Sequence, residues 1–326
     1  MTKPFPFPPN LAAIVKSTLN LKTEEEACLP HNARAFFDEM SGMTFERPDK
    51  DAKKQYKDVE KQDMVINSNG YKVKISILRP MGSKDQILPV VLFVHGGGWV
   101  TGSYNTHISL TSMLVNMIPA CLVFVEYSLS PEVKFPVAIE ECYAALCWVQ
   151  ENAESIHVDP HRLAVLGDSA GANISASLTI FAKQKGNNGI SFQVLGYPVL
   201  DTDFETESYQ QNHDDMILPR SNVKYFFDAY LNNLDEYKSP LATPLNSPLE
   251  LLQGLPPALI LTAELDVLRT EGEMYAKKLK EAGVDAVCVR YLGNHHGFLS
   301  PATFDSSGLA ALGQIASTLN RHWNEN

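Results

Sequence analysis

From residue 63 onward, short apolar runs alternate with longer stretches in which apolar and polar positions are mixed. The runs are rich in β-branched residues and too short for helices, so they predict strands. They cover residues 90–94, 122–125, 163–166, 194–197, 258–261 and 287–291. The stretches between and after them predict helices over residues 136–152, 170–185, 270–282 and 307–323. Strands that are apolar on both faces and separated by helices predict a mostly parallel central sheet flanked by helices.

Two earlier strands differ from this pattern. Residues 64–66 form one apolar run, and apolar residues alternate with polar ones from Val73 to Ile77. The turn residues 68–70, Ser-Asn-Gly, lie between them. These two strands are therefore predicted to form an antiparallel pair.

Two segments lack the alternation. Residues 1–55 mix proline, lysine, glutamate and aromatic residues, with helices predicted near 11–19 and 31–40. Residues 201–254 are rich in aspartate, asparagine, tyrosine and proline, with an amphipathic helix predicted over 223–231. A long insertion between parallel strands belongs above their carboxyl ends, where α/β sheets bind ligands. We therefore expect a helical cap made of residues 1–55 and 201–254, over a catalytic domain made of residues 56–200 and 255–326.

Composition narrows the classes of partner. The chain has 326 residues and a formal net charge of −11, which disfavours binding to nucleic acid and to anionic membrane surfaces. No stretch reaches the roughly 18 apolar residues that cross a bilayer, and the N-terminus lacks the apolar run of a secretory signal. The five cysteines show no CxxC and no metal-ligand spacing, so we expect reduced thiols, no metal and a cytoplasmic location.

The strongest chemical signal is Gly-Asp-Ser-Ala-Gly at residues 167–171, which follows a predicted strand and begins a predicted helix. That position is the one that a GxSxG nucleophile elbow requires, so Ser169 is the predicted nucleophile. Asp168, inside the elbow, is expected to make structural hydrogen bonds at the edge of the substrate pocket.

A second signal is His-Gly-Gly-Gly-Trp at residues 95–99, directly after a predicted strand. Successive glycines let backbone N–H groups approach a ligand, and donors of this kind stabilise the oxyanion that forms during acyl transfer. We expect the oxyanion hole to be made by the N–H groups of Gly96, Gly97 and Ala170. Trp99 is expected to line an apolar substrate pocket together with aromatic residues of the cap.

A serine nucleophile needs a base, and the base needs an acidic partner that orients it. His295 and His296 follow the last predicted strand, and spacing alone leaves the choice between them open. Asp266 follows the strand before and is the expected acid. The alternative acids are Glu264, Asp201 and Asp203.

Taken together, these motifs resemble the hormone-sensitive lipase family of α/β-hydrolase carboxylesterases, in the branch with a GDSAG elbow. The resemblance covers residues 60–322. It also includes Glu-Tyr-Ser-Leu-Ser-Pro-Glu at 126–132, Asp-Val-Leu-Arg at 266–269 and His-Gly-Phe at 296–298. The resemblance implies the α/β-hydrolase fold with a helical cap, and pairing as a homodimer.

The same resemblance implies roles for single residues. It selects His296 over His295 as the base and Asp266 over Glu264 as the acid, and it makes His95 a brace of the glycine loop. The expected reaction is hydrolysis of short- to medium-chain carboxylic esters through an acyl-enzyme, without metal or cofactor. An acyltransferase or amidase with the same triad is the alternative, and a non-catalytic small-molecule receptor is a third reading.

Overall fold

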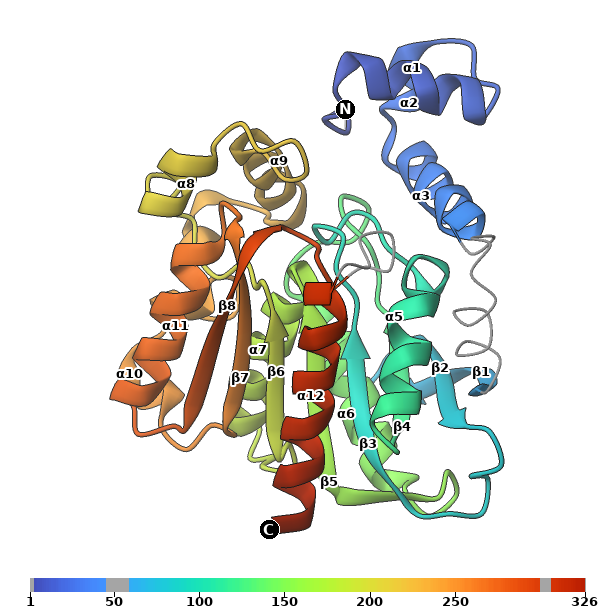
Figure 1. The fold of residues 1–326 in the computed structure, drawn as a ribbon, viewed down its shortest axis with the longest axis vertical. Helices are drawn as coiled ribbons and strands as arrows, with labels where there is room; N and C mark the ends of the chain where they lie inside the picture. The colour runs from blue at the N-terminus through green and yellow to red at the C-terminus, as the bar shows by residue number, and fades with distance from the viewer. Residues whose placement is uncertain (1–2, 45–58, 300–305, 326) are drawn as a thin grey trace.

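The computed structural model describes residues 3–44, 59–299 and 306–325. Among these residues, eight strands form one sheet in the order β1-β2-β4-β3-β5-β6-β7-β8 (Figure 1). β2 runs antiparallel to β1 and β4, and the other neighbouring strands are parallel. The strands are β1 (Val59–Ser68), β2 (Tyr71–Pro80), β3 (Leu88–Val94), β4 (Cys121–Glu126), β5 (Val158–Asp168), β6 (Phe192–Gly196), β7 (Ala258–Leu265) and β8 (Ala286–His295).

Helices cover both faces of the sheet. One face packs against α6 (Val137–Glu151), α7 (Ala170–Gln184) and α11 (Arg269–Glu281). The other face packs against α5 (Tyr104–Met117) and α12 (Ser306–Glu325) (Figure 1). In β5, Val165 belongs to the first core and Leu166 to the second, and both are almost fully buried. The predicted mostly parallel sheet, apolar on both faces, is therefore confirmed.

The strand register brings together chain segments that are far apart in sequence. Val94 pairs with Gly167 across β3 and β5, so the glycine loop after β3 begins beside the elbow that follows β5. Leu265 pairs with His295 across β7 and β8, so the next residues of the two strands also come close. Both pairings occur at the carboxyl edge of the sheet, the usual place for ligands in α/β proteins.

All eight predicted strands are present, and the two early ones form the predicted antiparallel hairpin. Helix α5 was not predicted from the sequence. It contains Thr106, Ser109, Thr111 and Ser112 among apolar residues, and such residues are weak helix formers. A capping box at its start, made by Ser103 and Thr106, was the available signal.

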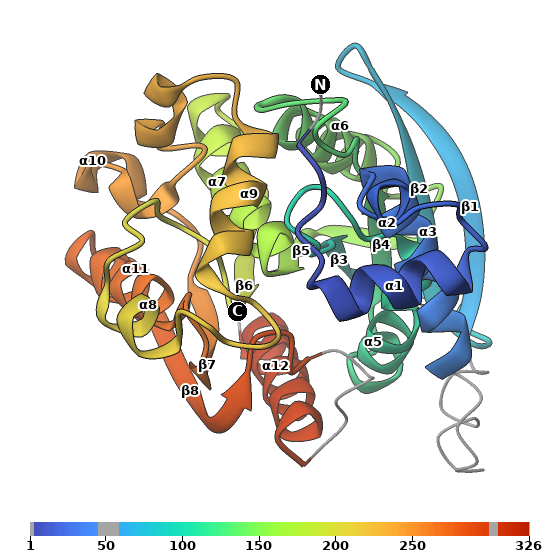
Figure 2. The same ribbon diagram turned by 90° about the horizontal axis from the view of Figure 1, so that it is seen from above.

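Other helices lie above the carboxyl edge of the sheet (Figures 1 and 2). They are α1 (Pro9–Thr18), α2 (Glu24–Ala27), α3 (Pro30–Thr44), α8 (Glu207–Asn212) and α9 (Arg220–Tyr230). Two further short helices, η2 (Pro244–Asn246) and α10 (Leu249–Leu252), pack instead against α11. The division into cap and catalytic domain stays a prediction, and residues 45–55 of the proposed cap lie outside the described residues.

Candidate active site

Ser169 lies at the turn between β5 and α7, with φ 53° and ψ −121°. A serine with positive φ is strained, and the turn persists because the residues around it fit no other arrangement. A Cβ atom on Gly167 would lie 2.3 Å from the Gly171 carbonyl oxygen, and one on Gly171 would lie 2.1 Å from the Val94 carbonyl oxygen. Both positions therefore need glycine, and the turn directs Ser169 towards a cavity that its side chain helps to line.

A chain of hydrogen bonds joins Ser169, His296 and Asp266. His296 Nε2 lies 2.9 Å from Ser169 Oγ, and His296 Nδ1 lies 2.8 Å from Asp266 Oδ2. The Asp266 carboxylate is 1% exposed, and its other oxygen accepts the Leu268 N–H at 3.0 Å. A carboxylate beside Nδ1 favours the tautomer that carries its proton there, which leaves Nε2 free to accept the serine proton.

The alternative residues from the sequence have other partners. His295 Nδ1 lies 2.5 Å from Asp215 Oδ2, and the Glu264 carboxylate accepts the Gly293 N–H at 2.7 Å. Asp201 and Asp203 accept hydrogen bonds from backbone N–H groups of their own loop. His296 is therefore the histidine that contacts Ser169, and Asp266 is the carboxylate that contacts His296. None of these alternative residues makes either contact.

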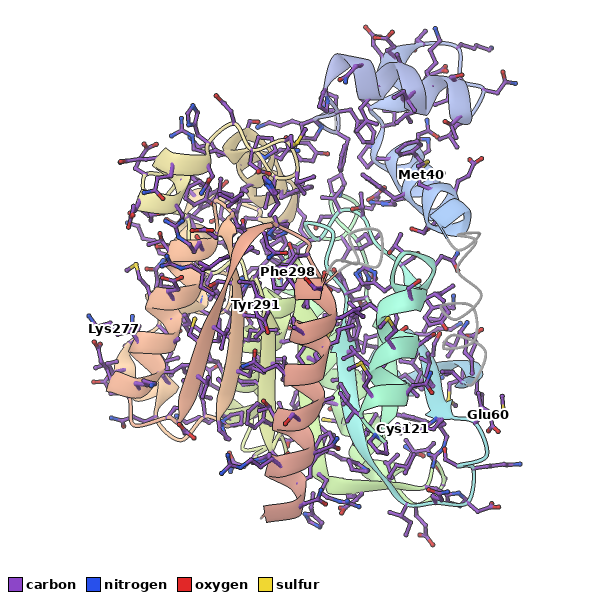
Figure 3. All side chains as sticks on the ribbon, in the orientation of Figure 1. Met40, Glu60, Cys121, Lys277, Tyr291 and Phe298 are labelled. Atoms are coloured by element: carbon purple, nitrogen blue, oxygen red, sulfur yellow. The ribbon has the colours of Figure 1, made fainter. Side chains whose placement is uncertain are left out.

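His296 sits directly after β8, on a loop fixed by aromatic contacts. Phe298 packs against Tyr291 between β8 and α12, with 5.0 Å between ring centroids (Figure 3). Tyr291 donates a hydrogen bond to Gln314 of α12 at 2.6 Å. The Tyr197 ring meets the imidazole of His296 edge-on, with 4.8 Å between ring centroids. These contacts restrict the orientation of the imidazole before any substrate arrives.

The glycine loop corrects one expectation from the sequence. The Gly96 N–H donates to the Asp168 carboxylate at 2.9 Å, so it is not free to donate to an oxyanion, and the assignment of Gly96 was wrong in this respect. Gly97 and Gly98 follow with φ of 117° and 61°. Within the described part of the chain, no acceptor takes the N–H groups of Gly97, Gly98 or Ala170.

His95 supports this loop from below. Its ring is fully buried, stacks on Tyr127 with 4.3 Å between centroids, and donates from Nδ1 to the Gly96 carbonyl oxygen at 2.8 Å. Tyr127 in turn donates its hydroxyl to the His95 carbonyl oxygen at 2.8 Å. Burial lowers the pKa of His95 to about 3, so the ring is neutral near pH 7.

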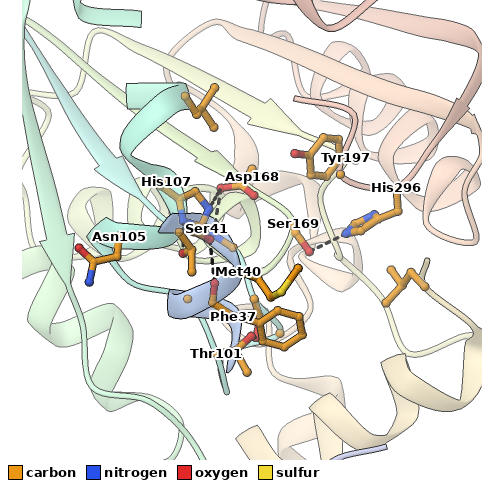
Figure 4. Close-up of a pocket in the computed structure, with 18 of the residues that line it drawn as sticks. Phe37, Met40, Ser41, Thr101, Asn105, His107, Asp168, Ser169, Tyr197 and His296 are labelled. Atoms are coloured by element: carbon orange, nitrogen blue, oxygen red, sulfur yellow. Dashed lines mark hydrogen bonds and ion pairs between the residues drawn. The ribbon is translucent and has the colours of Figure 1, made fainter. Parts of the chain in front are cut away.

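The cavity at Ser169 has a volume of about 450 Å³. Figure 4 shows Ser169 between His296 on one side and Asp168 with His107 on the other. The apolar wall of the cavity is formed by Phe37, Met40, Leu110, Leu218 and Phe226.

Asp168 lines this cavity as expected, but Trp99 does not. The Trp99 side chain is 1% exposed and stacks on Tyr230, with 4.4 Å between ring centroids. Trp99 is therefore a core residue that anchors the end of the glycine loop to α9.

Several lining residues were not identified from the sequence. Tyr197 ends an apolar run that reads as core, and His107 lies on the helix that was not predicted. Phe37 and Met40 come from α3, inside the segment that the sequence assigned to the cap, but the sequence did not show which residues of that segment reach the cavity. Pairings between segments so distant in sequence become visible only when the chain is folded.

Several known proteins are similar to this chain. A family model described as the alpha/beta hydrolase fold matches residues 91–300. The carboxylesterase NlhH of Mycobacterium tuberculosis is 39% identical over 235 residues, which cover 72% of this chain and 74% of that protein. An arylesterase of Saccharolobus solfataricus is 34% identical over 249 residues, covering 75% of this chain and 79% of that protein.

A solved structure from work on two fungal esterases of Rhizomucor miehei is similar along almost the whole chain. It superposes with a TM-score of 0.85 and 42% sequence identity, over 97% of this chain and 97% of that one. Among the described residues, no helix is long and apolar enough to cross a membrane.

Proposed function

The chain belongs to the α/β-hydrolase family, in its hormone-sensitive lipase branch, and is a carboxylic ester hydrolase; from this premise we propose that Ser169, His296 and Asp266 are its catalytic triad. The observation that carries the proposal is the chain of hydrogen bonds from Ser169 Oγ through the imidazole to Asp266. A receptor function is set aside because the related proteins are ester hydrolases.

In the first step, Ser169 Oγ attacks the ester carbonyl carbon while its proton passes to His296 Nε2. The carbonyl π electrons move to the oxygen, which becomes an oxyanion. Asp266 stays ionised and stabilises the imidazolium that forms. This role suits a carboxylate that is buried and held by the Leu268 N–H, because its orientation is fixed before the reaction.

The oxyanion is stabilised by the N–H groups of Gly97, Gly98 and Ala170. No acceptor among the residues that the structure describes takes these three N–H groups, and the Ala170 N–H is at the N-terminus of α7, where the helix dipole favours negative charge. In a site shielded from water, each such donor lowers the barrier by about 3 kcal/mol.

The intermediate collapses when the bond to the alcohol oxygen breaks and His296 returns its proton to that oxygen. Ser169 is left as an acyl ester. Water then attacks the acyl carbon, with His296 taking the water proton and passing it to Ser169 Oγ as the acid leaves. Atoms and charges balance with no group other than water and the triad.

The cavity indicates the class of ester. The alcohol oxygen must leave next to His296, so the acyl chain extends away from it, towards the wall formed by α3 and α5. An apolar cavity of about 450 Å³ suits acyl chains of short to medium length.

The test is hydrolysis of p-nitrophenyl esters of increasing acyl length by the wild type and by Ser169→Ala. We expect turnover of short and medium chains, a decline for long ones, and a loss of about 10³-fold or more in kcat for the variant. Ser175→Ala is the matched control, because Ser175 is a buried serine of the same helix α7 that does not line the cavity.

Transfer of the acyl group to an amine or alcohol, or cleavage of amides, would use the same residues. Product analysis with competing acceptors separates these reactions from hydrolysis. A cytoplasmic location and a homodimer stay predictions.

A further inference from the structure

The Asp168 carboxylate is a buried charge next to the nucleophile that the proposed reaction does not use. It is 8% exposed, and its Oδ1 accepts the Gly96 N–H at 2.9 Å and faces His107 Nε2 at 3.3 Å. A Cβ atom on Gly96 would lie 2.4 Å from Asp168 Oδ2, so the carboxylate packs directly against the first glycine of the loop. Because burying an unpaired carboxylate is strongly unfavourable, its partners hold it in this position.

The polar groups around His107 favour a proton on both of its nitrogens. Nδ1 lies 3.2 Å from the Ser103 carbonyl oxygen and 2.8 Å from Thr106 Oγ1. The carbonyl oxygen accepts hydrogen bonds only, and the Thr106 hydroxyl already donates its hydrogen to that same carbonyl at 2.9 Å. In this arrangement Nδ1 is the donor. Nε2 faces the Asp168 carboxylate, so an imidazolium fits the groups on both sides of the ring.

The charges around the pair support this assignment. Burial lowers the pKa of His107, but the charge and hydrogen bond of Asp168, with the charge of Glu126 at the end of β4, outweigh it and the net pKa is raised. Burial raises the pKa of Asp168, but His107 and the Gly96 N–H outweigh it and the net pKa is lowered. His95, the other nearby histidine, is neutral. Both shifts favour the ionised forms of His107 and Asp168.

We propose that His107 is a positioning residue of the oxyanion hole: its imidazolium holds the Asp168 carboxylate against the Gly96 N–H and so fixes the loop that presents Gly97 and Gly98. The inference rests on the proposed function. His107 does not exchange protons with the ester. Loss of its proton at alkaline pH leaves Asp168 without its cationic partner and loosens the loop, which slows turnover more than it weakens binding in the cavity.

His107→Gln tests this inference, because glutamine can keep an N–H donor near Asp168 but carries no charge. We would measure kcat and KM for p-nitrophenyl butanoate from about pH 5.5 to 9.5, at a wavelength independent of pH. Wild-type kcat should fall on the alkaline side, above the ordinary histidine pKa of about 6.5. The variant should lose roughly 10- to 100-fold in kcat at pH 7, change KM less than about threefold, and show no alkaline fall.

Asp168→Asn provides an independent test. It removes the charge that keeps His107 protonated, so the alkaline fall in kcat should move to lower pH. His161→Gln is the control and should behave as the wild type, because His161 is an exposed residue in the first half of β5. Thermal unfolding midpoints of all variants establish that the measured molecules are folded.

Two results would overturn the inference. One is a His107→Gln variant with wild-type kcat and an unchanged alkaline fall. The other is a reduced kcat with the same alkaline fall, which would mean that His107 contributes to packing only. If the wild type hydrolyses no ester at all, the proposed function itself fails, and that outcome is distinct from both.

Discussion

At the scale of single residues, three histidines near the glycine loop differ because their surroundings differ. His296 bridges a serine and a carboxylate, His107 bridges a carboxylate and a backbone carbonyl, and His95 is buried between aromatic rings. At His95, burial and the charge of His107 lower the pKa more than the Gly96 carbonyl and the Asp168 charge raise it, so the ring is neutral near pH 7.

His95 makes stability depend on pH. Its pKa is about 3 when folded and about 6.5 in the unfolded chain, so between these values the unfolded state binds one more proton. The free energy of unfolding should therefore fall as pH drops from 6.5 towards 3, by about 1.4 kcal/mol per pH unit from this residue alone.

Urea unfolding between pH 7 and about 4.5, on the wild type and on His95→Gln, measures this contribution. In the variant, the dependence of the free energy of unfolding on pH should be smaller by the contribution of about one proton. Other acidic groups should leave part of that dependence in place. Equal slopes in the two proteins would contradict the assignment of His95 as a neutral buried base.

At the scale of elements, α3 is both a wall of the cavity and a part tied to the glycine loop. Arg34 donates to the Val100 and Ser130 carbonyl oxygens, each at 2.7 Å, and pairs with Glu132 at 2.7 Å. Ser103, the N-cap of α5, donates to Asp38 of α3 at 2.5 Å. Through these bonds α3 is fastened to both ends of the segment that carries the loop into α5.

Arg34→Ala should therefore weaken substrate binding as well as the fold. Two carbonyl oxygens lose their donor, and Phe37 and Met40, within two turns on α3, lose their fixed position beside the cavity. We expect a destabilisation of about 1–3 kcal/mol and a rise in KM that exceeds the fall in kcat.

Steady-state kinetics with thermal unfolding measure both effects. Arg162→Ala, which removes a pair with Asp159 near the start of β5, is a control expected to leave KM unchanged. An Arg34→Ala variant with unaltered KM would show that α3 does not shape the substrate site.

What could be read from the sequence differs from element to element. Strand β3 and residues 163–166 of β5 are uniform apolar runs, and glycines that cannot carry a side chain mark the elbow. Helix α5, with serine and threonine among its apolar residues, gave a weak signal, and the contact between Gly96 and Asp168 joins residues 72 positions apart. The sequence shows which backbone N–H groups could donate to an oxyanion. Contacts between distant residues decide which of these N–H groups already has an acceptor.

At the scale of the whole molecule, one edge of the sheet gathers groups from most of the chain. Ser169 follows β5, Asp266 follows β7 and His296 follows β8, while α3 and α9 contribute Phe37 and Phe226 to the cavity above them. Parallel strands place all of these ends on the same side, so a long chain can build one small site.

The central claim is that Ser169 becomes acylated during turnover, and labelling with a p-nitrophenyl phosphonate tests it most directly. We expect one equivalent bound per chain, found by mass spectrometry on the peptide with Ser169, and loss of esterase activity in proportion to labelling. Inactivation with the label on another residue, or ester hydrolysis that persists after Ser169 is fully labelled, would contradict the account.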